Sequence, residues 1–140
     1  MKNLFRKAFC AFLICLCIFS LVSCGSGISD DEAKSHANDF FAAVGAGDFK
    51  KAEGFLHPER PAELETFFQG IEETMNIDFQ AGITIEKYTG FSSTVYDSTV
   101  DGATYELIIQ TKVGDTAVKF TVEIVRNDNG FGIYNLGLDG

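Results

Sequence analysis

The sequence predicts an α+β fold in which helices come first and an antiparallel sheet of four to five strands follows. Two observations support this prediction. Apolar residues recur at helical spacing as far as Met75 and alternate with polar residues from Ile83 onward. Glycine and asparagine turn signals separate the alternating segments, as in a meander with one packed and one solvated face. Helices that precede strands, instead of alternating with them, favour α+β over a parallel α/β fold.

A segment of a different kind precedes the helices. Residues 1–23 contain three basic residues and no acidic one, and the 15 residues Ala8–Val22 are almost free of polar atoms. A basic start followed by such an apolar stretch is typical of a secretory signal peptide. A membrane-spanning helix needs about 20 apolar residues, and this stretch of 15 is shorter than that. Residues 1–23 are therefore expected to be a signal peptide that is cleaved.

Leu21-Val22-Ser23-Cys24 ends this stretch and resembles the lipobox of bacterial lipoproteins, in which a Leu stands three residues before an obligatory Cys. The resemblance implies cleavage before Cys24, transfer of a diacylglyceryl group with palmitate-type chains to its sulfur, and a domain anchored to the bacterial cell membrane on its extracytoplasmic side. Cys10, Cys15 and Cys17 leave with the signal peptide, so acylation would consume the remaining thiol. The alternatives are a plain secretory signal or an uncleaved anchor with an incidental cysteine.

The charge of the chain changes once the signal peptide is set apart. The formal charge of the whole chain is -9, and loss of the three basic residues of 1–23 leaves 8 Lys+Arg against 20 Asp+Glu, or -12. Such an acidic domain excludes a nucleic-acid binder that depends on phosphate contacts. Residues 24–28 form a short flexible tether that spans roughly 17 Å. The domain at 29–140 should therefore stay near the bilayer while its charge repels anionic headgroups.

Capping signals place the first helix. Ser29 is suited to its N-cap and Glu32 to the reciprocal position of a capping box. Gly45 and Gly47 end the helix. Its apolar face consists of Ala33, His36, Ala37, Phe40, Phe41 and Val44.

Two shorter helices are expected next. Asp48 can cap a second helix, which His57-Pro58 stops because proline disfavours helix at the residue before it. The apolar residues of this helix are Phe49, Ala52, Phe55 and Leu56. Pro61 is suited to the first turn of a third helix. Its apolar stripe is Leu64, Phe67, Phe68, Ile71 and Met75.

Alternation then predicts the strands. Residues 83–88 form the first, Gly90 interrupts it, and 91–99 form a further candidate. The next two strands lie on either side of a Gly114-Asp115 turn, and 131–138 form the last. The inward-facing residues of the two central strands are Ala103, Tyr105, Leu107, Ile109, Val118, Phe120, Val122 and Ile124. Asn127-Asp128-Asn129-Gly130 predicts a hairpin with a type I′ turn at Asn-Gly.

This order of elements is similar to the NTF2-like superfamily, most closely over residues 42–52, where a Gly-Asp break separates two helices. The resemblance covers residues 29–138. It implies a curved sheet that wraps around the helices as a cone with an apolar pocket, in a domain of unassigned function. A cystatin-like arrangement, with one main helix on a meander, is the nearest alternative.

The residue pattern shows no catalytic or metal-ligating constellation, so no metal or cofactor is expected. His36 and His57 both suit structural roles. NTF2-like enzymes often use a Tyr–Asp pair for acid–base chemistry, and Asp39 lies beside the apolar face of the first helix, although a solvated role suits it better. The tyrosines on predicted strands are Tyr88, Tyr96, Tyr105 and Tyr134, and no spacing selects one as its partner.

The aromatic residues leave a choice between a packed core and an apolar pocket. The candidates for lining a pocket are Phe40, Phe41, Phe67, Phe68, Tyr105 and Phe120. Three functions follow: a lipid-anchored binding or interaction module of the cell envelope without enzymatic activity, a carrier of a small apolar ligand or lipid, and an acid–base enzyme. The first is favoured because no catalytic motif is recognised. Its expected partners are the membrane, through Cys24, and an envelope protein or small apolar ligand; a dimer is one option.

Overall fold

The computed structural model describes residues 27–60, 63–94 and 101–139, with the backbone alone for 91–94. The expected signal peptide, Cys24, Pro61 and Tyr96 lie outside these residues. Within these described residues three α-helices come first and four strands follow, so the predicted α+β class is confirmed. The elements are α2 (Asp30–Gly45), α3 (Phe49–Glu53), α4 (Leu64–Met75), the 3-10 turn η2 (Phe79–Ala81), β1 (Ile83–Thr94), β2 (Ala103–Val113), β3 (Thr116–Asn127) and β4 (Gly130–Leu138).

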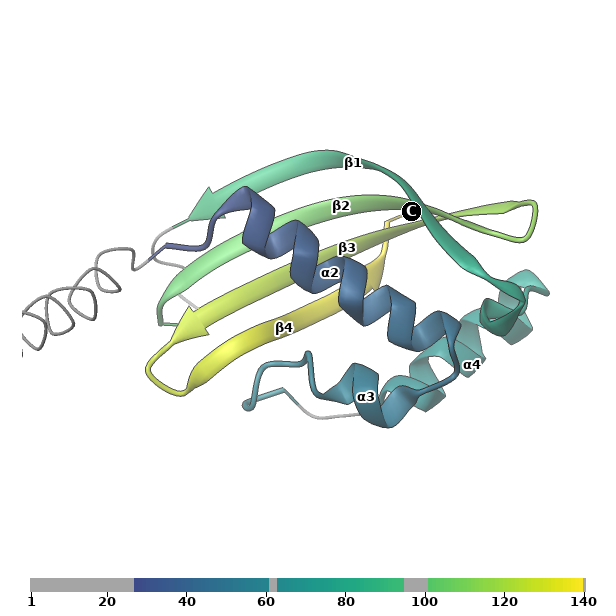
Figure 1. The fold of residues 1–140 in the computed structure, drawn as a ribbon, viewed down its shortest axis with the longest axis horizontal. Coiled ribbons are helices and arrows are strands. Elements are labelled where there is room, and N and C mark those ends of the chain that lie inside the picture. Colours follow the sequence, from purple (N-terminus) through teal and green to yellow (C-terminus); the bar gives the residue numbers. More distant parts are fainter. Residues whose placement is uncertain (1–26, 61–62, 95–100, 140) are drawn as a thin grey trace, which may run out of the picture.

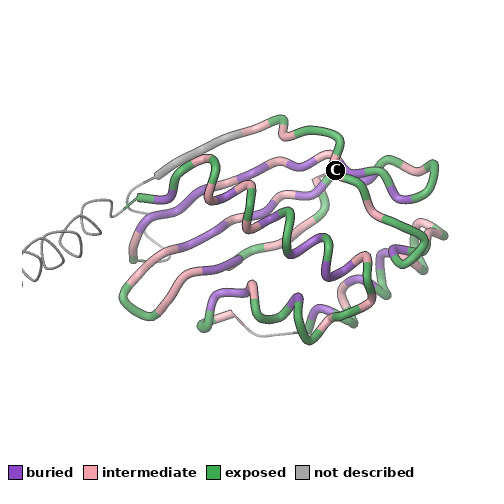
Figure 2. The backbone as a smooth tube through the Cα atoms, in the orientation of Figure 1, coloured by how far each residue is buried: buried purple, intermediate pink, exposed green. Residues whose placement is uncertain are grey.

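The four described strands form one open antiparallel sheet in the order β1-β2-β3-β4. Helix α2 lies along one face of this sheet. Helices α3 and α4 lie next to the C-terminal end of α2 (Figure 1). Buried and less buried residues alternate along β2 and β3 (Figure 2), as expected where one face packs and the other meets solvent. The predicted meander is confirmed.

The start of α2 confirms one half of the capping box. The Ser29 hydroxyl accepts a hydrogen bond from the Glu32 backbone N–H at 3.2 Å. The Glu32 carboxylate, which was expected to reach back to Ser29, instead binds the guanidinium of Arg126 at the end of β3. A charged partner stabilises a carboxylate more than a backbone amide does, so the long-range ion pair replaces the local bond.

The segment after α3 departs from the prediction. Helix α3 ends at Glu53, so Phe55 and Leu56 are not helical. Leu56 makes a parallel bridge with Ile133 of β4, where the His57 N–H donates to the Ile133 carbonyl and the Ile133 N–H donates to the Phe55 carbonyl, both at 2.9 Å. Strand β4 has unpaired backbone groups at the sheet edge, and these offer the segment partners that a local helix pattern does not reveal.

The interruption at Gly90 proved to be a bulge within one strand. Strand β1 runs through it with register shifts between Ile85 and Lys87 and between Tyr88 and Gly90. A Cβ at Gly90 would lie 2.8 Å from the Ile108 side chain, so glycine permits the close approach of β2. The expected strand at 91–99 is therefore a continuation of the first strand as far as Thr94.

The β3–β4 hairpin is confirmed, but its turn is not type I′. Asn127 pairs with Gly130, which leaves Asp128 and Asn129 in the loop. Asn76 is the one non-glycine residue of the described chain with a positive φ, whereas a type I′ turn needs two central residues of that kind. The Asn127 Oδ1 atom organises the turn by accepting from the Asn129 N–H at 3.0 Å and the Gly130 N–H at 3.2 Å.

Candidate functional site

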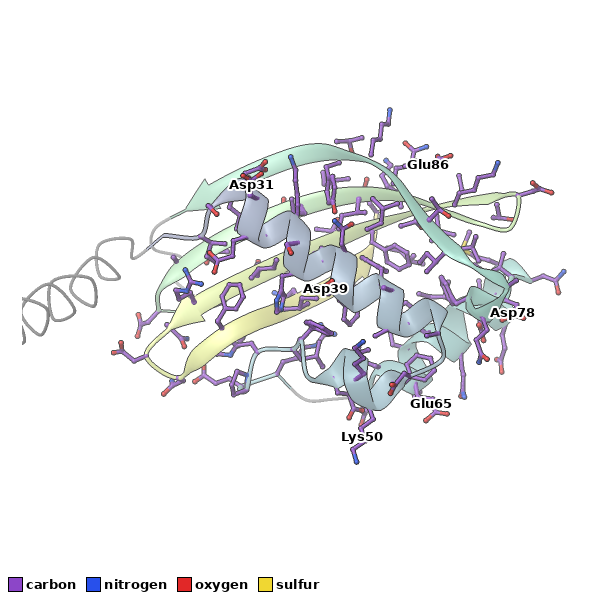
Figure 3. The ribbon with its side chains drawn as sticks, in the orientation of Figure 1. Asp31, Asp39, Lys50, Glu65, Asp78 and Glu86 are labelled. Carbon is purple, nitrogen blue, oxygen red and sulfur yellow. The ribbon has the colours of Figure 1, made fainter. Side chains whose placement is uncertain are left out.

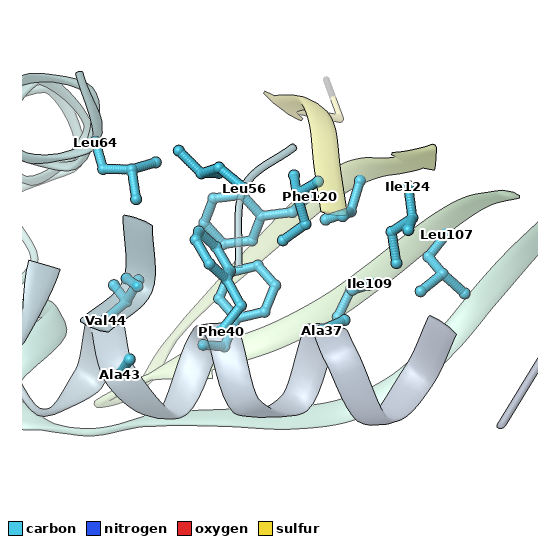
Figure 4. Close-up of a cluster of buried hydrophobic side chains, with 14 of the residues drawn as sticks. Ala37, Phe40, Ala43, Val44, Leu56, Leu64, Leu107, Ile109, Phe120 and Ile124 are labelled. Atoms are coloured by element: carbon cyan, nitrogen blue, oxygen red, sulfur yellow. The ribbon is translucent and has the colours of Figure 1, made fainter. Parts of the chain in front are cut away.

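The layer between the helices and the sheet is packed with aromatic rings (Figure 4). Phe40, Phe41, Phe68 and Phe120 are at most 1% exposed, and Phe79 of η2 joins them. The ring centroids lie 5.0 Å apart for Phe41 and Phe120 and 5.0 Å apart for Phe68 and Phe79. Spacings in this range are those of favourably packed aromatic pairs. Five of the six pocket candidates thus lie in the hydrophobic core, these four phenylalanines and Tyr105.

Tyr105 also makes a polar contact, and the sixth candidate, Phe67, is less buried. Tyr105 is buried and donates a hydrogen bond from its hydroxyl to Asp30 Oδ1 at 2.6 Å. Phe67 is half-buried on α4, where it lines a surface hollow beside β4. The six residues therefore do not come together around one pocket.

A Tyr–Asp pair does exist, but the aspartate is Asp30 instead of Asp39. Hydrogen bonds from Lys34 and Tyr105 lower the pKa of Asp30, while burial and the bond to Asp30 raise the pKa of Tyr105 to about 12. To act at neutral pH, a carboxylate that serves as general base needs a raised pKa, and a tyrosine that serves as general acid needs a lowered one. The pair is thus built to hold α2 to β2. Asp39 is exposed on the outer side of α2 (Figure 3).

Both histidines make structural contacts. His36 is bound through Nε2 to the Phe55 carbonyl at 2.7 Å and contacts the rings of Phe55 and Phe131. His57 is 1% exposed. Within the part of the chain that the structure describes, no three His, Cys, Asp or Glu residues gather where they could hold a metal ion.

The structure adds a feature that the sequence did not indicate, a hollow of about 590 Å³ beside α4 and β4. Its walls carry one cation, one carboxylate, two aromatic rings and two small polar side chains. They are Arg60, Glu63, Thr66, Phe67, Tyr134 and Asn135.

A turn at residues 57–60 holds the backbone of Arg60. The Arg60 N–H donates to the His57 carbonyl at 2.9 Å, and the Glu59 N–H donates to His57 Nδ1 at 3.2 Å. Because Nδ1 accepts, Nε2 carries the ring proton and donates to Asn127 Oδ1 at 3.0 Å. The Glu59 carboxylate accepts from the side-chain amides of Asn127, at 3.1 Å, and Asn129, at 2.8 Å. The turn is therefore fixed to the β3–β4 hairpin.

Two glycines in β4 make room for this turn. A Cβ at Gly132 would lie 2.5 Å from the Leu56 carbonyl carbon and 2.6 Å from the His57 nitrogen. A Cβ at Gly130, where φ is +155°, would lie 2.7 Å from Pro58. Both glycines are visible in the sequence, but the residues that they contact lie more than 70 positions earlier, in the segment that leads to Arg60. Sequence patterns are local and therefore did not connect these glycines to that segment.

The guanidinium of Arg60 has unused hydrogen-bonding capacity. Its Nη1 atom is covered from solvent and has no hydrogen-bond partner among the described residues. Burial lowers the pKa of this guanidinium. A buried donor without an acceptor costs about 1–3 kcal/mol, and more when the group is charged.

A second hollow, of about 380 Å³, lies at the C-terminal end of β4. It is lined by Met75, Gln110, Ala117, Val118, Lys119, Leu138 and Asp139. Lys119 and Asp139 pair with each other at 2.7 Å, so the cation of this hollow already has a partner.

Comparisons of the chain with protein-family models, with curated proteins and with solved structures find no match. None of the helices in the described part of the chain has the length and apolar character needed to cross a membrane.

Proposed function

We propose that this chain is a lipid-anchored module of the bacterial cell envelope, held on the extracytoplasmic side through a diacylglyceryl-modified Cys24, and that it acts by binding a partner at its surface. The observation that carries the surface role is the aromatic core. Phe40, Phe41, Phe68 and Phe120 fill the layer where an apolar pocket would lie, with exposures of 1% or less. This packing favours surface recognition over an internal carrier site, and the pKa shifts of Asp30 and Tyr105 weigh against this pair as the base and acid of an enzyme.

The anchor is supported by the sequence, and the fold is compatible with a short tether. The Gly27 carbonyl accepts from Arg126 Nη1 at 2.9 Å, and Ile28 is buried in the core. Gly27 and Ile28, which were expected to belong to the flexible tether, therefore pack with the domain, and residues 24–26 would separate Cys24 from it. The carboxylates of Asp30, Asp31 and Glu32 begin α2 at this end, where they would meet the headgroups first.

An NTF2-like relationship belongs to the same proposal. It is supported by the order of the elements and by the Asp48 cap, whose side chain accepts from the Lys51 N–H at 3.0 Å after the break at Gly47. The observed four-strand open sheet, with α2 along one face, also suits the cystatin-like alternative.

The anchoring proposal is tested with the full chain expressed in a bacterium. Wild type should incorporate radiolabelled palmitate and sediment with membranes, whereas Cys24→Ala should lose the label and appear in the soluble fraction. Ser23→Ala is the matched control, because a small residue beside the cysteine is retained, and it should behave as wild type. Persistent membrane association of Cys24→Ala would show that the anchor lies elsewhere.

A further inference from the structure

We propose that the hollow between α4 and β4 binds a singly charged carboxylate carried by a flat apolar group, with Arg60 as the cation that receives the carboxylate. This inference rests on the proposed function only in placing recognition at the surface of the domain. It concerns the described residues and does not depend on acylation of Cys24.

The first argument is that Arg60 has a hydrogen-bond donor without an acceptor. Arg60 lines the hollow, and its Nη1 atom is covered without an acceptor. Arg126 shows how this chain satisfies a guanidinium when the site is purely structural, since it binds both Glu32 and the Gly27 carbonyl. Because Nη1 is covered, the Arg60 side chain must turn toward the hollow before a bound carboxylate can supply the acceptor that this atom lacks.

The second argument concerns the charge of the ligand. A guanidinium presents parallel N–H groups that match the two oxygens of a carboxylate, and such a bidentate pair is among the stronger hydrogen-bonded contacts in proteins. Glu63 lines the same hollow and would repel any anion, a doubly charged one more strongly than a singly charged one. The Thr66 hydroxyl can donate a hydrogen bond, and the Asn135 amide, which already donates to Glu123 Oε1 at 3.3 Å, has a second N–H that can do so. The site therefore suits a carboxylate better than a doubly charged phosphate ester.

The third argument concerns shape. The rings of Phe67 and Tyr134 form apolar walls, and about 590 Å³ is within the usual range of small-ligand sites, roughly 300–1,000 Å³. Tyr134 is backed by the buried His57 ring, at a centroid distance of 5.7 Å and an interplanar angle of 66°. A flat apolar group would contact both walls while its carboxylate meets Arg60.

The fourth argument is preorganisation. The turn that carries Arg60 is fixed by the hydrogen bond between His57 and Asn127. It is also fixed by the two hydrogen bonds that the Glu59 carboxylate accepts from side-chain amides of the hairpin. A cation on a fixed turn loses less conformational entropy on binding than one on a loose loop, which improves affinity.

The test measures binding to the ¹⁵N-labelled full chain in a neutral detergent by NMR titration. Phenylacetate is the probe and phenylacetamide is its uncharged control of the same shape. Phenylacetate should shift the Asn135 side-chain amide and bind at least tenfold more tightly than phenylacetamide. Equal affinities, or shifts confined to other surfaces, would overturn the proposal.

Variants separate the role of Arg60 from general charge. Arg60→Gln should abolish the tenfold preference for the acid. Arg60→Lys should keep part of that preference, because lysine retains the positive charge but lacks the two parallel N–H groups of a guanidinium. Lys50→Gln removes an exposed cation elsewhere and should leave the preference unchanged. If Arg60→Gln does not fold, Arg60→Lys decides the question: wild-type affinity for phenylacetate in that variant would contradict the bidentate contact.

The origin of the carboxylate is resolved with two peptides that end in phenylalanine, one with a free C-terminus and one amidated. Tighter binding of the free peptide than of phenylacetate would identify a chain terminus as the ligand, and the reverse order would identify a small acid. If palmitate labelling fails while phenylacetate still binds, the anchor is wrong and the site stands. If labelling succeeds and phenylacetate does not bind, the anchor stands and the site is wrong.

Discussion

Replacement of Gly132 by alanine should detach the segment after α3 from the sheet. The added Cβ would meet the Leu56 carbonyl carbon at 2.5 Å and the His57 nitrogen at 2.6 Å. Both atoms belong to the backbone, so they cannot move aside as the end of a flexible side chain can. The bridge between Leu56 and Ile133 would have to open.

The expected cost follows from the contacts that would open. Two backbone hydrogen bonds join the segment to Ile133, and each contributes about 0.5–1.5 kcal/mol net. Leu56 is 8% exposed, and burial of a leucine side chain contributes about 1.5–3 kcal/mol. A Gly-to-Ala change gains about 0.4–1 kcal/mol because the unfolded chain loses freedom. The free energy of unfolding of Gly132→Ala should therefore fall by about 2–5 kcal/mol.

Urea denaturation of the full chain measures this change. A slope of about 1–3 kcal/mol/M converts the loss into a midpoint that falls by roughly 1 M or more. Gly137→Ala is the matched control, because it lies in the same strand and an added Cβ there would have no atom within 4 Å. Hydrogen exchange should also accelerate at the His57 and Ile133 amides in Gly132→Ala. An unchanged midpoint, or an equal loss in Gly137→Ala, would refute the reasoning.

Two further predictions concern the core and the Tyr–Asp pair. Phe68→Ala should lower the free energy of unfolding by about 3–5 kcal/mol, because the removed ring is fully buried. Phe67→Ala should lower it by less, because Phe67 is half-buried. Urea denaturation of both variants measures the two losses, and equal losses would contradict the packing of Phe68. The pKa of Asp30 lies below its ordinary value of 3.8, so its ionised form stabilises the fold above that pH and the contribution disappears as the pH falls through the lowered value. Acidification below about pH 4 should therefore destabilise wild type more than Asp30→Asn, and parallel stability curves would contradict the pairing with Tyr105.

The elements that the sequence predicted well have their determinants close together in the chain. Ser29 and Asp48 cap α2 and α3 as expected, because an N-cap bond joins residues three apart. The alternation from Val118 to Ile124 placed the inward face of β3, since successive side chains of a strand point to opposite faces. Period and capping are local properties, and the structure reproduces both.

The features that escaped prediction depend on distant partners. Phe40 and Phe68 have the same pattern whether they line a pocket or fill a core, and Phe79, in a 3-10 turn that the sequence analysis did not include, completes the packing around Phe68. The sequence analysis assigned no role to Arg60, because its environment is made by β4 and by a hairpin about 70 residues later. No local pattern encodes that pairing.

The end of β3 connects the N-terminal end of the domain to the hollow. Arg126 binds the Gly27 carbonyl, and the next residue, Asn127, binds His57 of the turn that carries Arg60. Tyr134 of the hollow lies three residues along β4 from Phe131, which pairs with Arg126, or about 10 Å at the rise of a strand. Residues 24–26 add about 10 Å when extended. If Cys24 is acylated as proposed, the hollow therefore lies within roughly 30 Å of the bilayer, and a partner that reaches Arg60 must itself be close to the membrane surface.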